Sequence, residues 1–381
     1  MNKVITIFVV VIILCFLSCS KDKIVEPNNA SSSNTNNDQL KKEILVNLAD
    51  NVILPNNQLL LSKALDLKMN AEVFTNNPNL TNLISLQNNW KLVQNQWELN
   101  CLYNIGPVKD QYLFYAIDTW PSNLVFIDNV LAGTDSINSS YLDSKGSTIK
   151  GLPTIENFVF SLDHGNQSVL DSFNISNYQY RRKQYLNALV DNYLNKASKI
   201  DSIWGINQGI YYEEFINHTQ NEISGSFNVH LNNLIELLGY IIITKLEKPM
   251  GTSTGNPNPS LVESLNSENS LSNINQNIIM IENGLIGSPF NPNDKGINNL
   301  LDKINAQKGS NLLSVAIKQQ IDSIQLSIGQ IASNSIAIAV VNEPSQLDNL
   351  LNHFKELYDL LRIDVANSTD VIVTFSGNDG D

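Results

Sequence analysis

The spacing of apolar residues is the feature that most constrains the fold of this chain of 381 residues. Over long stretches, apolar side chains recur three and four residues apart, which places them on one face of a helix. Trp90, Val93 and Trp97 form one such stripe. Further stripes cover residues 40–69, 178–204, 231–241, 261–281, 312–332 and 346–363. The spacing therefore predicts an all-α chain.

Strand-like sequence is confined to two short segments. Residues 371–375 and, more weakly, 336–341 are rich in β-branched or other apolar residues, but neither comes with the hairpin partner that a sheet needs. Polar segments rich in glycine, serine, asparagine or proline interrupt the helical pattern around residues 138–150, 251–259 and 288–296. We expect two helical-bundle domains, residues 39–240 and 241–381, which also contain short irregular or strand-like segments.

The first residues have the pattern of an export signal. Lys3 precedes an apolar run, Val4 to Leu17, which is too short to span a bilayer comfortably. The run ends in Ser18-Cys19, where a small residue before cysteine is similar to a lipobox, the site at which the cysteine is lipidated and becomes the new N-terminus. We expect a signal peptide over residues 1–18 and a lipid on Cys19. A plain secretory signal or a buried N-terminal helix is the alternative.

The residues after Cys19 are polar. They are mainly asparagine, serine and charged residues, which bury too little apolar surface to offset the cost of ordering. Residues 19–38 are therefore expected to form the lipidated cysteine and a flexible tether. Ser20-Lys21-Asp22-Lys23 partly resembles the tag that places some lipoproteins on the outer face of the outer membrane. We expect an outer-membrane lipoprotein that faces the periplasm or the cell surface.

Charge and cysteine content exclude several classes of function. The chain has 24 basic and 37 acidic residues, which disfavours binding to nucleic acid and a polybasic membrane-binding face. Cys15 leaves with the signal peptide and Cys19 carries lipid, so Cys101 has no partner for an intramolecular disulfide. We interpret Cys101 as a buried apolar residue rather than a nucleophile.

The common catalytic motifs of hydrolases and nucleotide-binding enzymes are absent from the sequence. It has no His-Glu-x-x-His, Gly-x-Ser-x-Gly, Gly-x-x-x-x-Gly-Lys or Gly-x-Gly-x-x-Gly pattern. Of its four histidines, His218 and His230 would share a helix face only if one helix continued through Gly225. We therefore expect solvated histidines rather than a metal site.

The most informative segment is Gly151-Leu152-Pro153-Thr154-Ile155-Glu156. A glycine, a proline suited to a first helical turn and a glutamate three residues later are typical of a helix start, with the acid near the positive end of the helix dipole. The segment also resembles the Gly-x-His-x-x-Glu signature of the imelysin family, also called insulin-cleaving-metalloproteinase-like, with Pro153 where the histidine would stand. Further similarity to the family covers residues 47–55, 90–97, 117–121, 181–204, 245–251 and 375–381.

The resemblance implies an all-helical, two-domain fold of an exported protein associated with iron uptake, with a site where the domains meet. Gly151 and Glu156 match the motif glycine and acid, Asp118 and Trp120 match the family's Asp-x-Trp-Pro, and Arg182 is a weaker match. Glu156, Asp118, Arg182 and Trp120 are thus the candidates for contact with a ligand or metal. Glu156 can alternatively be a helix-start acid or a partner of Arg182, and Asp118 can cap or brace a turn.

Proline in place of histidine disfavours catalysis. A hydrolytic zinc site needs three protein ligands and an activated water, and Pro153 provides neither a nitrogen ligand nor a backbone donor. Carboxylates without histidine still suit iron or another divalent cation. We expect a non-enzymatic lipoprotein that binds a ligand or metal and acts with components of iron or haem uptake. The alternatives are a metal-dependent peptidase and an interaction or scaffold protein that binds a peptide or haem.

The predicted lipid anchor has a direct test. Cys19→Ser removes the thiol that would carry the lipid, so the variant should leave the membrane fraction and become soluble, while the wild type stays with the membrane. Fractionation followed by immunoblotting measures the difference. An unchanged distribution would remove the lipoprotein interpretation.

Overall fold

The fold is built almost entirely of helices. The computed structural model describes residues 30–205, 209–287 and 294–374. Helices make up nearly all the regular structure of these residues, which confirms the predicted all-α class. The described residues from Leu40 onward form one compact unit, and those up to Gln39 form another.

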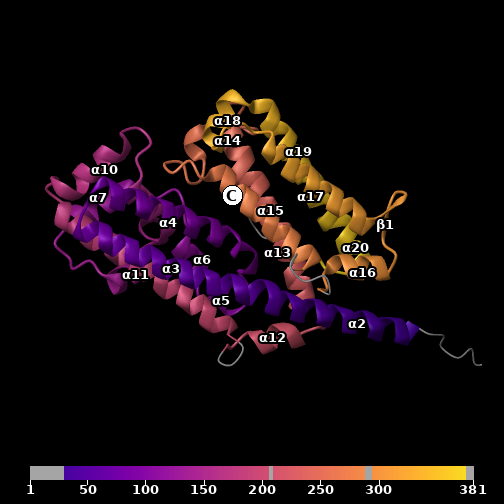
Figure 1. The fold of residues 1–381 in the computed structure, drawn as a ribbon. Coiled ribbons are helices and arrows are strands. Elements are labelled where there is room, and N and C mark those ends of the chain that lie inside the picture. Colours follow the sequence, from indigo (N-terminus) through magenta and orange to yellow (C-terminus); the bar gives the residue numbers. More distant parts are fainter. Residues whose placement is uncertain (1–29, 206–208, 288–293, 375–381) are drawn as a thin grey trace, which may run out of the picture. The chain divides into compact units, whose positions relative to one another are not determined.

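A first group of long helices comes from the earlier part of the chain. Helices α3 and α11 pack along each other, and α4 packs on α3 (Figure 1). Their apolar stripes meet in a core that includes Leu67, Trp90 and Tyr193, all at most 1% exposed. Asn79 caps the start of α4 by accepting a hydrogen bond from the backbone N–H of Asn82. The long helices of this part of the chain are α2 (Ala30–Asn47), α3 (Leu54–Asn76), α4 (Leu80–Glu98) and α11 (Gln179–Trp204).

Shorter helices connect these long ones and cover their ends. They are η2 (Leu48–Ile53), η3 (Cys101–Tyr103), α5 (Pro107–Asp110), α6 (Leu113–Ile117), α7 (Leu124–Ala132), α8 (Ser139–Asp143), η4 (Ser147–Ile149), α9 (Gly151–Val159), α10 (Gly165–Asn174) and α12 (Tyr212–Asn217). Helix α9 contacts both α4 and α11, and α6 contacts α9 and α11. The motif segment therefore lies inside the helical layer rather than on a free surface loop.

A second group comes from the later part of the chain. Helix α17 packs on α15 and α19, and α15 also packs on α4 of the first group (Figure 1). The group comprises α13 (Ser226–Tyr240), η5 (Ile241–Glu247), α14 (Lys248–Met250), η6 (Pro259–Leu261), α15 (Ser270–Ile286), α16 (Ile297–Lys303), α17 (Leu313–Gly329), α18 (Ile336–Asn342), α19 (Pro344–Asp359), η7 (Leu360–Val365) and α20 (Ala366–Thr369).

The expected domain boundary at residues 240 and 241 falls inside continuous helix. Tyr240 ends α13, and the chain continues through the π-helix η5 into α14 without leaving helical conformation. The division into domains at this position stays a prediction. Two other segments, η2 and η7, are also π-helical.

The strand prediction for residues 336–341 is wrong. Ile336–Asn342 is helix α18, and the Ser335 side chain accepts a hydrogen bond from Ala337 N. Ile336 and Val340 pack into the core, so tertiary packing outweighs the strand propensity of their side chains. Residues 371–374 have no regular structure. The small antiparallel sheet lies elsewhere and consists of β1 (Gln307–Lys308) and β2 (Asn311–Leu312).

The helix predicted over residues 261–281 begins only at Ser270. Residues 262–269 form an irregular segment in which Ser264 and Glu268 have positive φ angles of 53° and 54°. Such conformations are uncommon for residues other than glycine, and they persist where surrounding contacts determine them. We call residues 262–269 the bracing segment.

The predicted signal peptide and lipidation site, residues 1–18 and Cys19, lie outside the described residues. Of the predicted tether, residues 30–38 belong to α2. In the part of the chain that the structure describes, no helix combines the length and apolarity needed to cross a bilayer.

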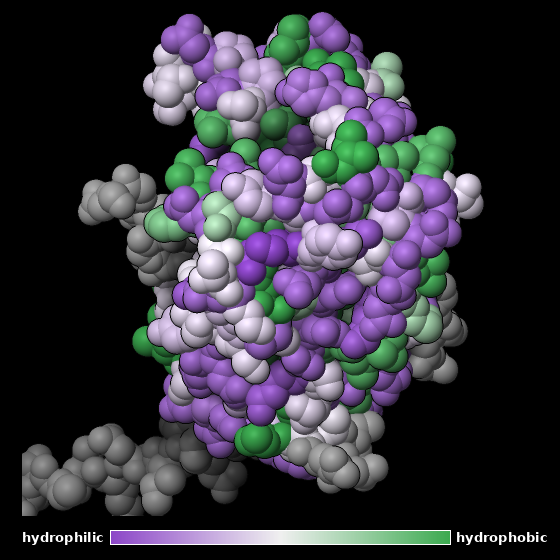
Figure 2. All heavy atoms as spheres, turned by 90° about the vertical axis from the view of Figure 1, so that its left-hand side faces the viewer, coloured by the Kyte–Doolittle hydropathy of each residue, from purple (hydrophilic) through white to green (hydrophobic). Residues whose placement is uncertain are grey.

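One face of the molecule can be followed in the space-filling view. Hydrophilic residues cover most of it, and apolar residues are dispersed between them (Figure 2). This distribution is normal for a surface in contact with water.

Gly151, the motif glycine, is required by backbone geometry. Its φ is 77°, and a Cβ atom there would collide with the carbonyl oxygen of Ile117 at the end of α6. We predict that Gly151→Ala lowers the free energy of unfolding by more than about 2 kcal/mol, because strain and a backbone clash add up. Chemical denaturation measures this change.

Gly146→Ala is the matched control. Gly146 has a φ of −58°, and a Cβ atom there would meet open space. Its stability should stay within about 0.5 kcal/mol of the wild type. Equal stability of the two variants would contradict the predicted role of Gly151.

Candidate functional site

A pocket of about 300 Å³ opens where the two groups of helices meet. Its polar lining comes from the end of α4, α5, the end of α6, α13, the π-helix η5 and the bracing segment. These elements are far apart in sequence and are brought together by packing of α15 on α4. The pocket is the candidate functional site.

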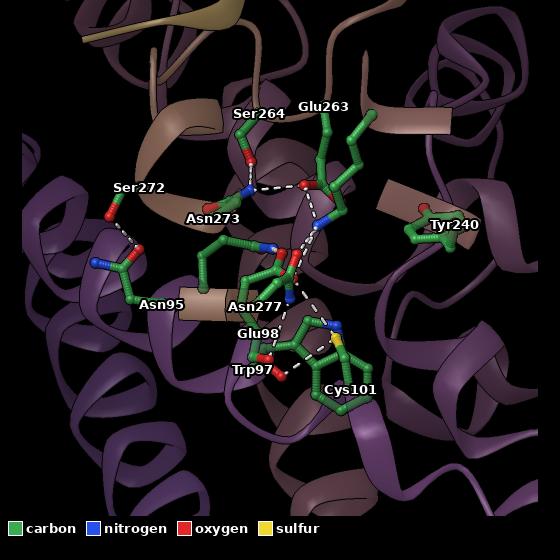
Figure 3. Close-up of polar contacts among 12 residues, drawn as sticks. Asn95, Trp97, Glu98, Cys101, Tyr240, Glu263, Ser264, Ser272, Asn273 and Asn277 are labelled. Atoms are coloured by element: carbon green, nitrogen blue, oxygen red, sulfur yellow. Dashed lines mark hydrogen bonds and ion pairs between the residues drawn. The ribbon is translucent and has the colours of Figure 1, made fainter. Parts of the chain in front are cut away.

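Three carboxyl groups gather at this pocket. One oxygen from each of Glu98, Asp118 and Glu263 lies within 4.8 Å of the others. Glu98 is 0% exposed and Glu263 5% exposed, whereas Asp118 is partly buried. Figure 3 shows Glu98 and Glu263 approaching each other from different segments. We call these three residues the carboxylate cluster.

The ammonium group of Lys245 lies between two of these carboxylates. Its Nζ is 2.8 Å from Glu98 Oε2, 2.8 Å from Glu263 Oε2 and 3.0 Å from Asn277 Oδ1. Burial alone would lower the pKa of Lys245, but the charges of Glu263 and Glu98 outweigh it and hold the pKa well above its ordinary value. Lys245 therefore carries a positive charge inside the site.

Amide side chains fix the buried carboxylates in place (Figure 3). Asn277 Nδ2 donates to Glu98 Oε2 at 2.7 Å, and Gln94 Nε2 donates to Glu98 Oε1 at 2.9 Å. Asn273 Nδ2 donates to Glu263 Oε2 at 2.9 Å. Buried charges are tolerated when such partners are present.

Asp118 is the member of the cluster with unused hydrogen-bonding capacity. Its Oδ1 is buried and has no hydrogen-bond partner among the described residues. Burial raises the pKa of Asp118 well above its ordinary value, and the charges of Glu263 and Glu98 raise it further. Asp118 follows α6 directly, but its side chain does not brace the turn through Oδ1 as the sequence suggested.

A second unpartnered group lies beside Asp118. The Tyr193 side chain on α11 is 1% exposed, and its hydroxyl has no hydrogen-bond partner within the described ranges. Burial raises its pKa well above the ordinary value, and the neighbouring ionisable groups of Asp118 and Cys101 raise it further. Asp118 Oδ1 and the Tyr193 hydroxyl are thus two buried oxygens with unmet hydrogen-bonding capacity, and Asp118 lines the pocket.

Aromatic side chains line much of the pocket wall. Trp97 and Phe114 meet edge to face with ring centroids 4.4 Å apart, and Tyr115 and Tyr240 also line the pocket. Trp120 is absent from the lining, but its Nε1 donates to the Tyr240 hydroxyl at 3.0 Å. Trp120 thus supports the pocket wall through Tyr240.

Cys101 lies at the pocket rather than in a closed core. It is partly buried, and its Sγ lies 3.6 Å from Glu98 Oε2. Burial raises the pKa of its thiol well above the ordinary value. The thiol is therefore protonated at neutral pH, which agrees with the expectation that it is not a nucleophile.

Glu156 lies beside the cluster and anchors the bracing segment. Its Oε1 accepts the backbone N–H of Ser267 at 2.8 Å. Asn266 Nδ2 donates to Asn157 Oδ1 at 2.9 Å, which ties the same segment to α9 a second time. The motif acid thereby positions the segment that carries Glu263.

The prediction that Glu156 sits at the start of its helix is wrong. Helix α9 begins at Gly151, so Glu156 lies in the second turn, and the first turn has no acidic residue. Glu156 is 5% exposed, and burial raises its pKa to about 7. Pro153 is also buried in α9, where its carbonyl accepts a hydrogen bond from Asn157 Nδ2 at 2.9 Å.

Arg182 does not pair with Glu156. Its guanidinium stacks on the ring of Phe158 at 4.4 Å and lies 5.3 Å from that of Phe173. Its Nη2 donates to the carbonyl of Asn157 at 3.4 Å, and burial lowers its pKa to about 10. Arg182 packs against the far end of the motif helix instead of lining the pocket.

The expectation of solvated histidines is wrong for His230. It is 1% exposed, stacks on Tyr103 and makes a 2.7 Å hydrogen bond through Nε2 with the carbonyl of Gly284. Burial lowers its pKa to about 4. His218 instead pairs with Glu222 at the surface, so the two histidines are not joined in one site.

A larger cavity of about 450 Å³ lies near α7 and the start of α11. Of its two cationic residues, Arg181 donates to the backbone carbonyls of Val130, Leu131 and Asp135, and Lys145 lies over the ring of Tyr141. These hydrogen bonds give Arg181 a structural role, because they hold the end of α7. We therefore place the candidate site in the smaller pocket, where charged groups converge.

Sequence reasoning found Asp118 but missed Glu98, Lys245 and Glu263. Lys245 had a signal, because it continues the apolar stripe that runs through Leu238 and Ile241 at a spacing of three and four. A charged residue at a core position of a stripe is unusual and indicates a buried partner. The partners themselves could not be read from the sequence.

Together, the fold and the site define an all-helical protein with an acidic pocket between two layers of helices. The chain belongs to the imelysin family, whose family model matches residues 53–362. No curated protein shows significant similarity to the chain.

Among the solved structures that share the fold are the following two. One is an iron-regulated protein A precursor from Parabacteroides distasonis ATCC 8503, with a TM-score of 0.71, 17% sequence identity and coverage of 87% of this chain and 95% of the other. The other is an imelysin-like protein from Psychrobacter arcticum 273-4, with a TM-score of 0.71, 14% identity and coverage of 89% and 98%. At these identities the similarity establishes the fold.

The raised pKa of Glu156 predicts a pH dependence of stability. A folded-state pKa of about 7 lies above the ordinary carboxyl value of 4.5, so the wild type loses stability as the pH rises between these values. Glu156→Gln cannot ionise and should not show this loss. The free energy of unfolding of the variant minus that of the wild type should therefore be larger at pH 8 than at pH 5, by on the order of 2 kcal/mol.

Urea denaturation at both pH values measures the effect. Glu268→Gln is the control, since Glu268 is in the same bracing segment but is exposed. Its pH profile should match that of the wild type. If the free energy of unfolding of Glu156→Gln changes with pH in the same way as that of the wild type, burial does not raise the pKa of Glu156 as assigned.

Proposed function

We propose that this protein is a non-enzymatic binding protein of the cell envelope that takes a hard metal cation in the pocket at Glu98, Asp118 and Glu263. The observation that carries the proposal is the convergence of three carboxyl oxygens within 4.8 Å of one another. Oxygen ligands of this kind suit iron and other hard cations. The unpartnered Oδ1 of Asp118 provides independent support, because Asp118 lines the pocket and a bound ligand would satisfy this oxygen.

The proposed role is linked to iron uptake. The relative from Parabacteroides distasonis is described as iron-regulated, and the N-terminal sequence of this chain resembles a lipoprotein signal. A lipid-anchored protein with a cation pocket suits capture at a membrane surface and transfer to uptake components. We propose the outer membrane as its location, with the pocket facing the periplasm or the cell surface.

We favour binding over peptidase activity because of the ligand set. None of the four histidines belongs to the carboxylate cluster, and Pro153 replaces the motif histidine. A hydrolytic site also has to position a water near an acid or base and an electrophilic metal. The positive charge of Lys245 between two of the carboxylates weakens the case for a tightly held resident metal ion.

The proposal is tested by titrating the full-length protein, purified in detergent, with Mn²⁺ and, under anaerobic conditions, with Fe²⁺. Isothermal titration calorimetry should show one binding event per chain. Asp118→Asn should weaken binding about tenfold or more, because an anionic ligand becomes a neutral one.

The control is Asp348→Asn, which removes an exposed carboxylate on α19 and should leave the affinity unchanged. If the wild type binds neither ion, or if Asp118→Asn binds as tightly as the wild type, the cation-binding function is wrong. Cleavage of an unfolded protein substrate that depends on metal and on Glu156 would favour the peptidase alternative.

A further inference from the structure

Lys245 occupies part of the space that a bound cation would need. Its ammonium lies 2.8 Å from an oxygen of Glu98 and 2.8 Å from an oxygen of Glu263. Both of these residues belong to the carboxylate cluster. A cation bound by all three carboxylates would therefore approach this ammonium closely.

The position of Lys245 is determined by its helix. It lies on the π-helix η5. Short π-helical turns are rare in proteins and occur frequently at functional sites. Its side chain is 3% exposed and is also held by Asn277 Oδ1 at 3.0 Å. The ammonium is thus a built-in part of the pocket rather than a mobile surface charge.

The charge balance of the pocket has a consequence for affinity. Two of the three carboxyl groups of the cluster are met directly by the ammonium of Lys245, and Lys109 and Glu236 add one further charge of each sign to the pocket lining. Two positive charges a few ångströms apart in a partly buried site repel each other strongly. A monovalent ion would gain little by replacing an ammonium, whereas a divalent or trivalent ion gains more from the same carboxylates.

We propose that Lys245 acts as an internal competing cation that sets the affinity and charge selectivity of the pocket. In the empty pocket its ammonium pairs with Glu98 and Glu263 and keeps both carboxylates in place. A multivalent cation binds by displacing the ammonium from at least one of them. Binding is consequently reversible and selective for ions of higher charge. This inference rests on the proposed cation-binding function.

A purely structural ion pair makes the opposite prediction. If Lys245 only holds α4, η5 and the bracing segment together, its removal would disturb the carboxylates and weaken cation binding. If Lys245 competes with the ligand, removal of its charge strengthens binding. The direction of the change in affinity therefore separates the two roles.

The test uses Tb³⁺, a hard trivalent ion whose luminescence is sensitised by a nearby indole, here Trp97 in the pocket wall. The full-length wild type, Lys245→Met, Lys245→Gln and Lys245→Arg are titrated in detergent. Both neutral variants should bind Tb³⁺ about tenfold tighter or more, because a like charge is removed. Lys245→Arg keeps the charge and should bind within about threefold of the wild type.

Lys245→Gln keeps the test decisive if Lys245→Met does not fold, because glutamine retains an N–H donor for a carboxylate. A further measurement needs only the wild type with ¹³C-labelled lysine. Saturation with diamagnetic La³⁺ should shift the Lys245 side-chain resonance, which is assigned from the spectrum of Lys245→Arg. An unshifted resonance at saturation overturns the displacement.

The outcomes distinguish this inference from the function on which it rests. If the wild type binds Tb³⁺ and the neutral variants bind equally or more weakly, the competing role of Lys245 is wrong and the cation-binding function stands. If neither the wild type nor the neutral variants bind, both proposals fail. Tighter binding by the neutral variants supports both.

Discussion

The buried ion pairs of Lys245 with Glu98 and Glu263 connect the parts of the structure on which the site depends. One ammonium joins the end of α4, the π-helix η5 and the bracing segment. Taking such charges out of water is costly, and the cost is met only when every partner is in place. The amides of Gln94, Asn273 and Asn277 complete this set. The meeting of the two helical layers is therefore specified by charge as well as by apolar packing.

The family motif acts on this site through the backbone. Glu156 holds the N–H of Ser267 and so orders the segment that carries Glu263. Gly151 allows α9 to approach the end of α6, after which Asp118 follows. The motif therefore lies behind the carboxylate cluster. Pro153 provides no nitrogen ligand within this segment, whereas Glu156 positions the bracing segment.

A pocket with its own ammonium suits transfer better than storage. Strong, permanent coordination needs a full set of free anionic ligands, whereas here two carboxylates are already paired. The unpartnered Oδ1 of Asp118 gives an incoming ligand unused hydrogen-bonding capacity in the pocket wall. Capture and release at a membrane surface, as proposed for this chain, require a ligand to be bound but not held permanently.

Local sequence determined the helices, because a repeat of three and four residues places apolar side chains on one face wherever that face is buried. The segment from Gly151 to Glu156 was equally readable as the start of a helix, since this depends on neighbouring residues. The export pattern before Cys19 is local in the same way and stays a prediction. Tertiary structure alone decided that Ile336–Asn342 is helical and that Glu98, Lys245 and Glu263 meet. A buried charge is stable only beside its partner, and the partners of Lys245 are supplied by segments distant in sequence, which no local pattern specifies.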